Sequence, residues 1–447
     1  MANGWRCVRN YNFLMSQLAI LGGEPIRRRP FSPWPQYRQS DLDRIARTVE
    51  SRHWGGYPYP TALASEFCDA FAEMQGVRYV LPVANGTLAI TVALMAAGVR
   101  FGDEVIVPAY TWDGTATAAL AMGAVPVFAD VDPDTYCLDV ESARSAITPR
   151  TKAIIPVHLA MRFTDMQGLR TLAREHGLKI IEDCAHAHGG SYRREGAGSM
   201  GDIGCFSLQE SKLMTSGEGG LLTTNHLEYY EALQTVVNCG RASLTDQFGQ
   251  RLLGLNYRVT DLQIALLIGQ LETLPSLREL RAERAALLTR SVAGVSCIRA
   301  LPVQDGITQP THYCYVLQYR PPQGRPAPHR DLFVAALEAE GIPCDGRFYE
   351  AVYRSDLFYA TPENCPQLTR DYSDVHCPVS ERAAYDESIW LFQFCLIGEE
   401  EDTLDVARAI EKVGSQLEVL AAQDPSLAGV KAMGRAQRAR VERAKNY

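Results

Sequence analysis

The chain has 447 residues, of which 46% are hydrophobic and 21% are charged, with 44 Lys and Arg against 52 Asp and Glu. This length predicts two or three domains, and the net charge of −8 argues against a protein dedicated to nucleic-acid binding. No apolar run reaches the ~18–20 residues that a membrane helix requires, so no membrane partner is expected. The twelve cysteines are scattered without a CxxC pair, which favours a reducing, cytoplasmic location over a disulfide scaffold.

The N-terminal part of the chain is expected to hold an extension, an arm and a first helix. Residues 1–16 show no periodicity, and Met15 is a plausible alternative start. Residues 18–34 are rich in Pro and Arg, which is typical of an ordered arm. The segment 40–52 has helical spacing. Its predicted features are an N-cap at Ser40 and an apolar face formed by Leu42, Ile45 and Val49.

Short apolar, β-branched runs then alternate with segments of helical spacing. The clearest helices are 87–97 and 166–175. This alternation predicts an α/β fold with a mainly parallel sheet whose two faces are both covered. The seven runs that we predict as strands are 79–83, 104–108, 125–129, 153–157, 178–181, 205–208 and 220–224.

The second half of the chain predicts a smaller α+β domain. A long helical stretch, 260–291, carries one proline at 275 and is expected to bridge the two domains. A strand at 312–319 and helices at 331–340 and 400–418 follow it. We therefore divide the chain into an N-terminal extension and arm (1–34), a large domain (35–274), a small domain (275–423) and a basic tail (424–447), which we interpret as a solvent-exposed end.

Candidate functional residues follow four of the predicted strands, and ligands of open α/β sheets bind at the carboxyl ends of strands. Asn85-Gly86-Thr87 lies between a strand and a helix, where free N–H groups and the helix dipole favour an anion such as phosphate. A plain capped turn is the alternative. Trp112 ends the next strand, and it suits either a stacking contact with a planar ligand or the filling of a domain interface.

Two acids and a lysine complete the candidate set. Glu182 and Asp183 follow an apolar strand, so one carboxylate is expected at the ligand edge beside a cation such as a pyridinium, unless the pair forms an ordinary salt bridge. The Cys184-x-His186-x-His188 spacing does not suit the usual zinc ligand sets, and no metal is expected. Lys212 follows a strand between Ser residues and glycines, where it is suited to act as nucleophile and base or to cap a loop.

Together these parts predict a pyridoxal 5′-phosphate site. A phosphate cradle, an aromatic plate, a carboxylate and a lysine occur in that chain order on strand ends. In such a site the lysine forms a Schiff base, the acid keeps the ring nitrogen protonated and the aromatic residue sets the ring plane.

The sequence resembles the DegT/StrS-like aminotransferases, fold type I pyridoxal-phosphate enzymes of amino-sugar and aminocyclitol biosynthesis. The resemblance covers about residues 18–420. It is carried by the Asn85-Gly86-Thr87 turn and by PAYTW (108–112), PVHL (156–159), EDCAHAHG (182–189), GDIGCFSLQESK (201–212) and GEGG (217–220). It implies a large domain with a mainly parallel seven-stranded sheet, a smaller α+β C-terminal domain and a homodimer with shared active sites.

The resemblance also implies a role for each site residue. Lys212 is implied as the Schiff-base lysine, and its presence favours transamination over the dehydratase branch, which has His there. Asp183 is the implied partner of the pyridine nitrogen. The remaining implied cofactor contacts are Trp112 stacking on the ring, His186 near the ring hydroxyl, Gly86, Thr87 and Ser207 on the phosphate, and Asn256 on the partner subunit's phosphate.

The resemblance specifies the substrate less closely than it specifies the cofactor contacts. Segments 34–36, 136–139 and 377–382 resemble enzymes that aminate scyllo-inosose with L-glutamine, whereas 239–241 and 353–358 resemble 3-amino-5-hydroxybenzoate synthases, which catalyse a dehydrating aromatisation. A nucleotide-sugar ketone is a further alternative, as is a non-catalytic regulatory role, against which the intact Lys212 and Asp183 argue. The family usually has Gly within two residues after PVHL, and the bulkier segment 160–163 here departs from it near the family's substrate. We predict Tyr349 as a substrate contact, ahead of His312, Arg347 and Tyr353.

Overall fold

The computed structural model describes residues 16–241, 252–369, 371–423 and 425–426. The expectations for residues 1–15 and for nearly all of the basic tail therefore lie outside the described residues. Within the described part, no helix combines the length and the apolar character needed to cross a membrane.

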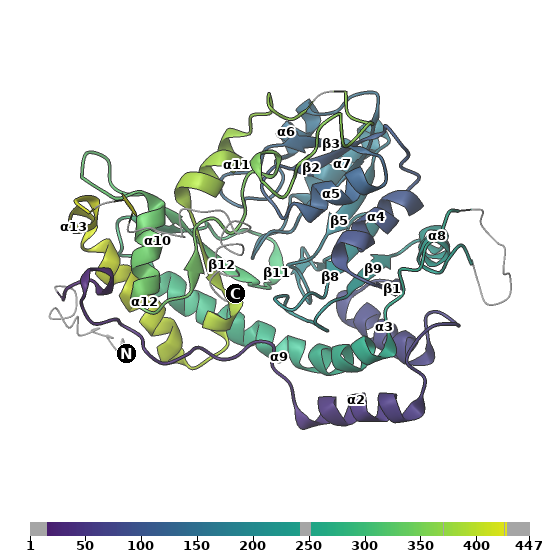
Figure 1. Ribbon diagram of the computed structural model, residues 1–447, viewed down its shortest axis with the longest axis horizontal. Helices are drawn as coiled ribbons and strands as arrows, with labels where there is room; N and C mark the ends of the chain where they lie inside the picture. Colours follow the sequence, from purple (N-terminus) through teal and green to yellow (C-terminus); the bar gives the residue numbers. More distant parts are fainter. Residues whose placement is uncertain (1–15, 242–251, 370, 424, 427–447) are drawn as a thin grey trace.

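A seven-stranded sheet forms the centre of the large domain (Figure 1). Its strand order is β1-β9-β8-β5-β4-β2-β3, and β9 alone runs antiparallel to its neighbours. The mainly parallel α/β sheet is thus confirmed, and the carboxyl ends of β1, β2, β5 and β8 lie on one edge. The strands are β1 (Tyr79–Val83), β2 (Glu104–Pro108), β3 (Val125–Ala129), β4 (Thr151–Ile154), β5 (Lys179–Asp183), β8 (Ile203–Ser207) and β9 (Gly220–Thr224).

Helices cover this sheet because its strands are apolar on both faces. Helix α4 packs on β5, β8 and β9 and also contacts α5 and α8, so its residues 89–94 are all buried. Its sequence accordingly lacks a polar stripe. The helices of this region are α3 (Ala62–Gln75), α4 (Gly86–Ala96), α5 (Gly114–Ala121), α6 (Val140–Ser145), α7 (Met166–His176) and α8 (Leu227–Val237).

A single long helix, α9 (Asp261–Val292), connects the large sheet to a second, antiparallel sheet (Figure 1). Pro275 lies inside α9 without ending it, and we propose that the boundary near residue 275 falls within this helix. The second sheet has the order β10-β12-β14-β13, and a third sheet, β11-β6-β7, joins segments from both halves. These strands are β10 (Ile298–Ala300), β12 (Cys314–Tyr319), β13 (Cys344–Asp345), β14 (Ser388–Phe392), β6 (Ser191–Tyr192), β7 (Glu195–Gly196) and β11 (Ile307–Gln309).

The remaining elements surround the second sheet. The predicted helix at 400–418 ends early, and a short separate helix follows it. The elements are α10 (Arg330–Ala339), α11 (Pro378–Arg382), α12 (Glu400–Gly414), α13 (Leu417–Ala421), the 3₁₀ turns η1 (Ala19–Leu21), η2 (Val352–Arg354) and η4 (Gln393–Leu396), and the π-helical turn η3 (Ala383–Glu387).

The N-terminal arm packs on the small domain through buried ion pairs. Arg27 contacts Asp402 at 2.8 Å and Asp405 at 2.9 Å on α12. The Lys412 ammonium donates to Glu340 at 2.9 Å, and Glu340 also accepts the backbone N–H of Ala19. A buried charge is stable only with such partners, so these pairs hold the arm in one place.

Helix α2 (Gln39–Ser51) is present as predicted, but its predicted N-cap is wrong. Arg38, one residue before the helix, is the N-cap, and Asp41 closes a capping box, so Ser40 lies inside the helix. The apolar face formed by Leu42, Ile45 and Val49 is largely uncovered, since Leu42 and Val49 are 46% and 47% exposed and Ile45 is half-buried.

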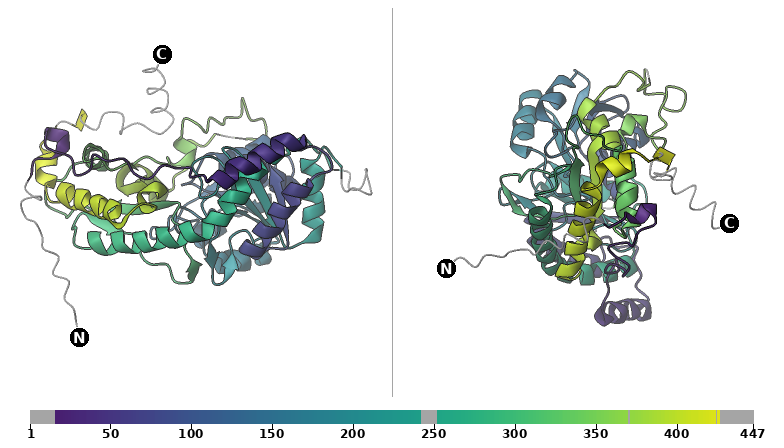
Figure 2. Two further views of the ribbon diagram at one scale, coloured as in Figure 1. Left: turned by 90° about the horizontal axis from the view of Figure 1, so that it is seen from below. Right: turned by 90° about the vertical axis from the view of Figure 1, so that its left-hand side faces the viewer.

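The polar side of α2 instead faces α9, on which the helix lies at the surface (Figure 2). Asp41 is buried beside Gly269, and Arg44 pairs with Glu272 at 3.0 Å. The apolar stripe therefore points away from the subunit.

Candidate active site

A cavity of about 1090 Å³ opens at the carboxyl edge of the large sheet. Strand ends, helix starts and segments of the small domain all contribute to its wall. Eight of the nine predicted site residues line it: Gly86, Thr87, Trp112, Asp183, His186, Ser207, Lys212 and Tyr349. Asn256 does not line it; this residue is exposed, in the segment that precedes α9.

The head of α4 forms a cradle suited to an anion. Asn85 caps the helix, since its side chain accepts the N–H of Leu88 at 2.9 Å and its carbonyl accepts the N–H of Ala89. The first two helical N–H groups belong to Gly86 and Thr87, which both line the cavity. A Cβ atom on Gly86 would lie 2.7 Å from that of Ser207, so only glycine allows this close approach.

Asp183 ends β5 with its carboxylate at the cavity and only 6% exposed. One oxygen accepts the Thr115 hydroxyl at 2.9 Å and the other accepts the N–H of Ala185 at 3.1 Å. Burial raises the pKa of Asp183, although these hydrogen bonds and the charge of Lys212 oppose the shift. A cationic ring nitrogen placed here would stabilise the charged carboxylate.

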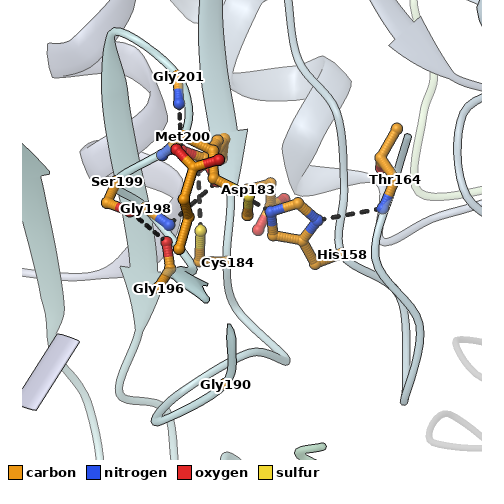
Figure 3. Close-up of polar contacts among 12 residues, drawn as sticks. His158, Thr164, Asp183, Cys184, Gly190, Gly196, Gly198, Ser199, Met200 and Gly201 are labelled. Atoms are coloured by element: carbon orange, nitrogen blue, oxygen red, sulfur yellow. Dashed lines mark hydrogen bonds and ion pairs between the residues drawn. The ribbon is translucent and has the colours of Figure 1, made fainter. Parts of the chain in front are cut away.

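Glu182, the neighbouring acid, has a structural role, and Figure 3 labels its partners His158, Gly198, Met200 and Gly201. It is fully buried, and its oxygens accept the backbone N–H groups of Gly198, Met200 and Gly201. The ring of His158 donates to it at 2.9 Å. Glu182 is thus held by hydrogen bonds inside the domain, and Asp183 is the acid of the pair that lies at the cavity.

The only group of potential metal ligands among the residues that the structure describes is His158, Glu182 and Cys184, whose ligand atoms lie within 4.8 Å of one another. The carboxylate already accepts four hydrogen bonds, and burial raises the pKa of the Cys184 thiol well above its usual value. A protonated thiol is a poor ligand, so the chemistry of this group does not favour a metal.

Lys212 projects into the cavity from the loop after β8. Its ammonium lies 4.5 Å from the centre of the Tyr313 ring, a cation–π contact that keeps it beside the pocket. The side chain of Gln393 donates to the carbonyls of Ser211 and Lys212, which ties this loop to the small domain. The lysine is therefore held at the junction of the two domains.

Two of the lining residues that were not predicted from the sequence contact the predicted ones. Thr115 lies one turn after Trp112 and supports Asp183; a hydroxyl three residues after the PAYTW segment was the available signal. Tyr313 stacks on His186 with ring centres 4.0 Å apart, and His186 in turn contacts the Tyr349 hydroxyl at 3.1 Å. Nothing in the alternation of the predicted strand 312–319 distinguished Tyr313 from a core residue.

The other polar candidates lie outside the cavity wall. Arg347 pairs with Asp331 at 3.0 Å, and the Tyr353 hydroxyl donates to Glu381 at 2.7 Å. His312 also does not line the cavity, nor does any residue of the bulky segment 160–163. The departure from the family pattern after PVHL therefore does not change the cavity wall directly.

A family model described as the DegT/DnrJ/EryC1/StrS aminotransferase family matches residues 35–407. A Streptoalloteichus tenebrarius protein, provisionally named L-glutamine:3-amino-2,3-dideoxy-scyllo-inosose aminotransferase, is 41% identical over 415 residues, covering 91% of this chain and 100% of the relative. The L-glutamine:2-deoxy-scyllo-inosose aminotransferase of Streptomyces paromomycinus is 36% identical over 417 residues, covering 89% and 97%. The crystal structure of a 3-amino-5-hydroxybenzoic acid synthase superposes with a TM-score of 0.76 at 30% identity, covering 86% and 98%.

The doubly covered sheet, with a lysine, a buried acid and an anion cradle at its carboxyl edge, defines a fold type I enzyme. The chain belongs to the DegT/DnrJ/EryC1/StrS aminotransferase family. It is an aminotransferase, and so it acts on a small-molecule amino donor and a small-molecule acceptor. The family implies pyridoxal phosphate as the cofactor.

Proposed function

We propose that the protein is a pyridoxal-phosphate aminotransferase that moves an amino group from L-glutamine or L-glutamate to a ketone on a cyclitol ring. The observation that carries the cofactor assignment is the convergence of the α4 head, the Asp183 carboxylate and Lys212 on one cavity. Gly86, Thr87 and Ser207 would hold the phosphate, Trp112 would stack on the ring and His186 would approach the ring hydroxyl. The buried carboxylate of Asp183 suits a protonated ring nitrogen.

Lys212 is the proposed proton carrier. When bound, the cofactor supplies an electron sink for the donor's Cα carbon. Lys212 would hold the cofactor covalently until the donor amine replaces it, and its Nζ atom would then take the proton from the donor's Cα. The Tyr313 ring, whose centre lies 4.5 Å from this amine, would help to hold it at the cavity. The acceptor ketone would reverse the sequence, which gives ping-pong kinetics.

The relatives support an acceptor of the inosose class. The three with 37–41% identity are provisionally named for a ketone that already carries an amine, 3-amino-2,3-dideoxy-scyllo-inosose. Those with 34–36% identity are named for 2-deoxy-scyllo-inosose. We therefore propose a deoxy-inosose as acceptor, in aminoglycoside-type biosynthesis, with the amine-bearing ketone as the better substrate.

We further propose that the enzyme works as a cytoplasmic homodimer with shared active sites. Asn256 is exposed and outside its own cavity, as expected for a side chain that reaches the phosphate of a partner subunit. The outward apolar stripe of α2 supports an interface on that side, together with Tyr37, Trp54 and Tyr57, which are 53–71% exposed. The described cysteines are all free thiols, which suits a reducing compartment.

The test runs the acceptor half-reaction backwards. Holoenzyme is mixed with scyllo-inosamine, or with the 1,3-diamino cyclitol that amination of the amine-bearing ketone would give, and the visible absorption band of the cofactor is followed. Loss of the band with release of a cyclitol ketone is expected, faster for the diamine. An unchanged band with both amines would overturn the cyclitol assignment.

Lys212→Ala is the matched control for this experiment. It is expected to bind the cofactor without a covalent link and to show no turnover, because no other described amine lines the cavity. Full turnover by this variant would contradict the proposed role of Lys212.

The alternative is an aromatising dehydratase, favoured by the likeness to 3-amino-5-hydroxybenzoic acid synthase. Formation of an aromatic product from a dehydroshikimate-type substrate would establish it. If neither the cyclitol amines nor a dehydroshikimate-type substrate react, a nucleotide-linked keto-sugar is the next acceptor to assay.

A further inference from the structure

The backbone of the three residues that end at Lys212 is held by side chains from the N-terminal arm and from the second half of the chain. The indole N–H of Trp34, in the arm, donates to the carbonyl of Glu210 at 3.0 Å. The side-chain amide of Gln393, in η4, donates to the carbonyls of Ser211 and Lys212 at 2.8 and 3.3 Å. Three consecutive carbonyl groups are thus fixed, and the last of them belongs to the lysine that projects into the cavity.

The orientation of the Gln393 amide is determined by Arg281, a residue of α9. The Arg281 guanidinium donates to Oε1 of Gln393 at 2.5 Å. A guanidinium has no acceptor and a backbone carbonyl has no donor. The amide oxygen must therefore face Arg281, and the amide NH₂ group must face the carbonyls of Ser211 and Lys212. Both side chains are buried, so bulk water does not compete for these groups.

Stability does not account for a charge at the position of Arg281. The side chain is fully buried, and among the described residues no carboxylate pairs with it and no group accepts from its Nε or Nη1 atoms. Burial lowers the pKa of Arg281 to about 9 from 12.5, so the group is still charged at neutral pH. An uncompensated buried charge destabilises a fold. We therefore look for the role of Arg281 in what its guanidinium holds, which is the Gln393 amide.

Trp34 connects Arg281 to the same loop by a second route. The centre of its ring lies 5.3 Å from Cζ of Arg281, a cation–π contact, while its indole N–H holds Glu210. Arg281, Trp34 and Gln393 therefore form one connected unit, with members from α9, the arm and η4. From the cavity, the Tyr313 ring contacts the Lys212 ammonium at 4.5 Å. The lysine is thus held both through its backbone and at its amine.

We propose that Arg281 is a positioning residue for Lys212: by orienting the Gln393 amide, it fixes the peptide group of the lysine and so the place of Nζ in the cavity. The proposal rests on the proposed function for one point, that Nζ of Lys212 is the atom that joins pyridoxal 5′-phosphate. Without Arg281 the Gln393 oxygen is left buried and unsatisfied, so this side chain is expected to leave its rotamer and release the two carbonyls. The effect falls on the lysine and not on the groups that hold the phosphate or the ring.

The first test follows the attachment of the cofactor to the lysine. When apoprotein is mixed with pyridoxal 5′-phosphate, the Lys212 amine adds to the aldehyde carbon and water leaves, so a carbon–nitrogen double bond forms and the visible band appears. The rate constant of this step at saturating cofactor should fall about tenfold in R281M and in Gln393→Met. A wild-type rate constant in either variant would overturn the proposal.

Arg284→Met is the matched control. Arg284 lies on α9 one turn after Arg281 and contacts Glu283 at 2.7 Å and the carbonyl of Gly398 at 3.5 Å, away from the lysine loop. This variant is expected to keep the wild-type rate constant. A loss equal to that of R281M would contradict the assignment to Arg281.

The double variant R281M/Q393M tests the route through Gln393. Because Arg281 acts through this amide, adding R281M to Gln393→Met should slow attachment by less than about twofold further. Additive losses would show that Arg281 acts on the lysine by another route, and the proposal would be wrong.

The second test separates positioning from a general structural role. In the Lys212→Ala background the cofactor binds without a covalent link, so its Kd reports only the groups that hold the phosphate and the ring. Adding R281M there should change this Kd by less than about twofold. A rise of about tenfold would mean that Arg281 supports the whole cavity, and the positioning role would fail. If R281M does not fold, Gln393→Met alone and in the Lys212→Ala background decides both tests.

Failure of this proposal and failure of the proposed function are distinguishable. If the wild type forms no covalent link with pyridoxal 5′-phosphate, the proposed function itself fails. If the link forms and is slowed as expected but no cyclitol reacts, the acceptor assignment fails and the role of Arg281 stands. If cyclitols react but the variants attach the cofactor at the wild-type rate, transamination stands and the positioning role of Arg281 is wrong.

Discussion

Glu182 and Asp183 show how one position along a strand decides what a carboxylate does. Successive side chains of β5 point to opposite faces, so Glu182 enters a shell of backbone N–H groups while Asp183 meets Thr115 at the cavity. Both acids are buried, but only Asp183 lies where a bound ring nitrogen could share its charge. Their sequence context is the same, and the difference arises from what each face packs against.

Replacing Asp183 or its support should separate catalysis from cofactor binding. Asp183→Asn removes the charge that stabilises a protonated ring nitrogen, so kcat should fall by about 10²–10³-fold or more while the cofactor still binds. Thr115→Val removes one hydrogen bond to the carboxylate, and about a tenfold fall is expected. Single-turnover rates and cofactor titration measure the two effects. An Asp183→Asn enzyme with normal kcat would show that the carboxylate has no such role.

His188 gives the protein a pH-dependent stability. It is fully buried, and burial, with the charges of Lys212 and Arg281, lowers its pKa to about 3 from an ordinary 6.5. Between these values the unfolded chain binds a proton at His188 that the folded chain does not. The His188 contribution to the free energy of unfolding is therefore complete above pH 6.5 and falls by about 1.4 kcal/mol per unit below it.

Thermal unfolding at pH 7.5 and 5.5 tests this linkage. The difference in Tm between the two pH values should be smaller for His188→Gln than for the wild type, whatever the effect of the substitution at pH 7.5. If the two proteins show the same difference, His188 is not buried in a neutral form.

At the scale of elements, the start of α4 depends on close approach to β8. Gly86→Ala would place a Cβ atom 2.7 Å from that of Ser207, so either the helix start or the strand end must shift. Such overpacking typically costs about 1–3 kcal/mol, and we expect the Kd of the cofactor to rise about tenfold or more. Titration of the apoprotein with the cofactor, followed by absorbance, measures this Kd.

A second substitution tests the cause. Ser207→Gly removes the nearest clashing atom and leaves the Cα of residue 207 at 3.0 Å, so Gly86→Ala should weaken cofactor binding less in the Ser207→Gly background than in the wild type. Equal losses in both backgrounds would mean that the steric contact is not responsible.

Helix α2 shows which features of an element its own sequence can predict. Helix α2 was predicted within one residue at each end because its spacing and polar start are local properties. Which face it buries is not local: the polar face meets Gly269 and Glu272 of α9, more than 200 residues away, and the apolar stripe is left outside. Amphipathic spacing indicates that one face will be covered, and it does not say by what.

At the scale of the whole molecule, that stripe is the proposed subunit interface. Leu42→Asp should therefore weaken the dimer, with the Kd of association rising at least about tenfold because a charge replaces an apolar contact. Val419→Asp on α13 is the matched control, since Val419 is also 46% exposed and should leave association unchanged. Sedimentation velocity over a range of concentrations measures both. Equal behaviour of the two variants would exclude α2 from the interface.

The sequence by itself determined the class of fold and most of the cofactor side of the cavity. Apolar runs alternating with helices require a covered parallel sheet, and its strand ends bring Gly86, Asp183 and Lys212 to one edge. The tertiary structure alone decided the contributions of Thr115 and Tyr313, the separate roles of the two acids, and the exposure of α2. It also revealed the contact of the buried Arg281 with Gln393. These features depend on contacts between segments far apart in the chain, and no local spacing or composition encodes which distant group a side chain will meet.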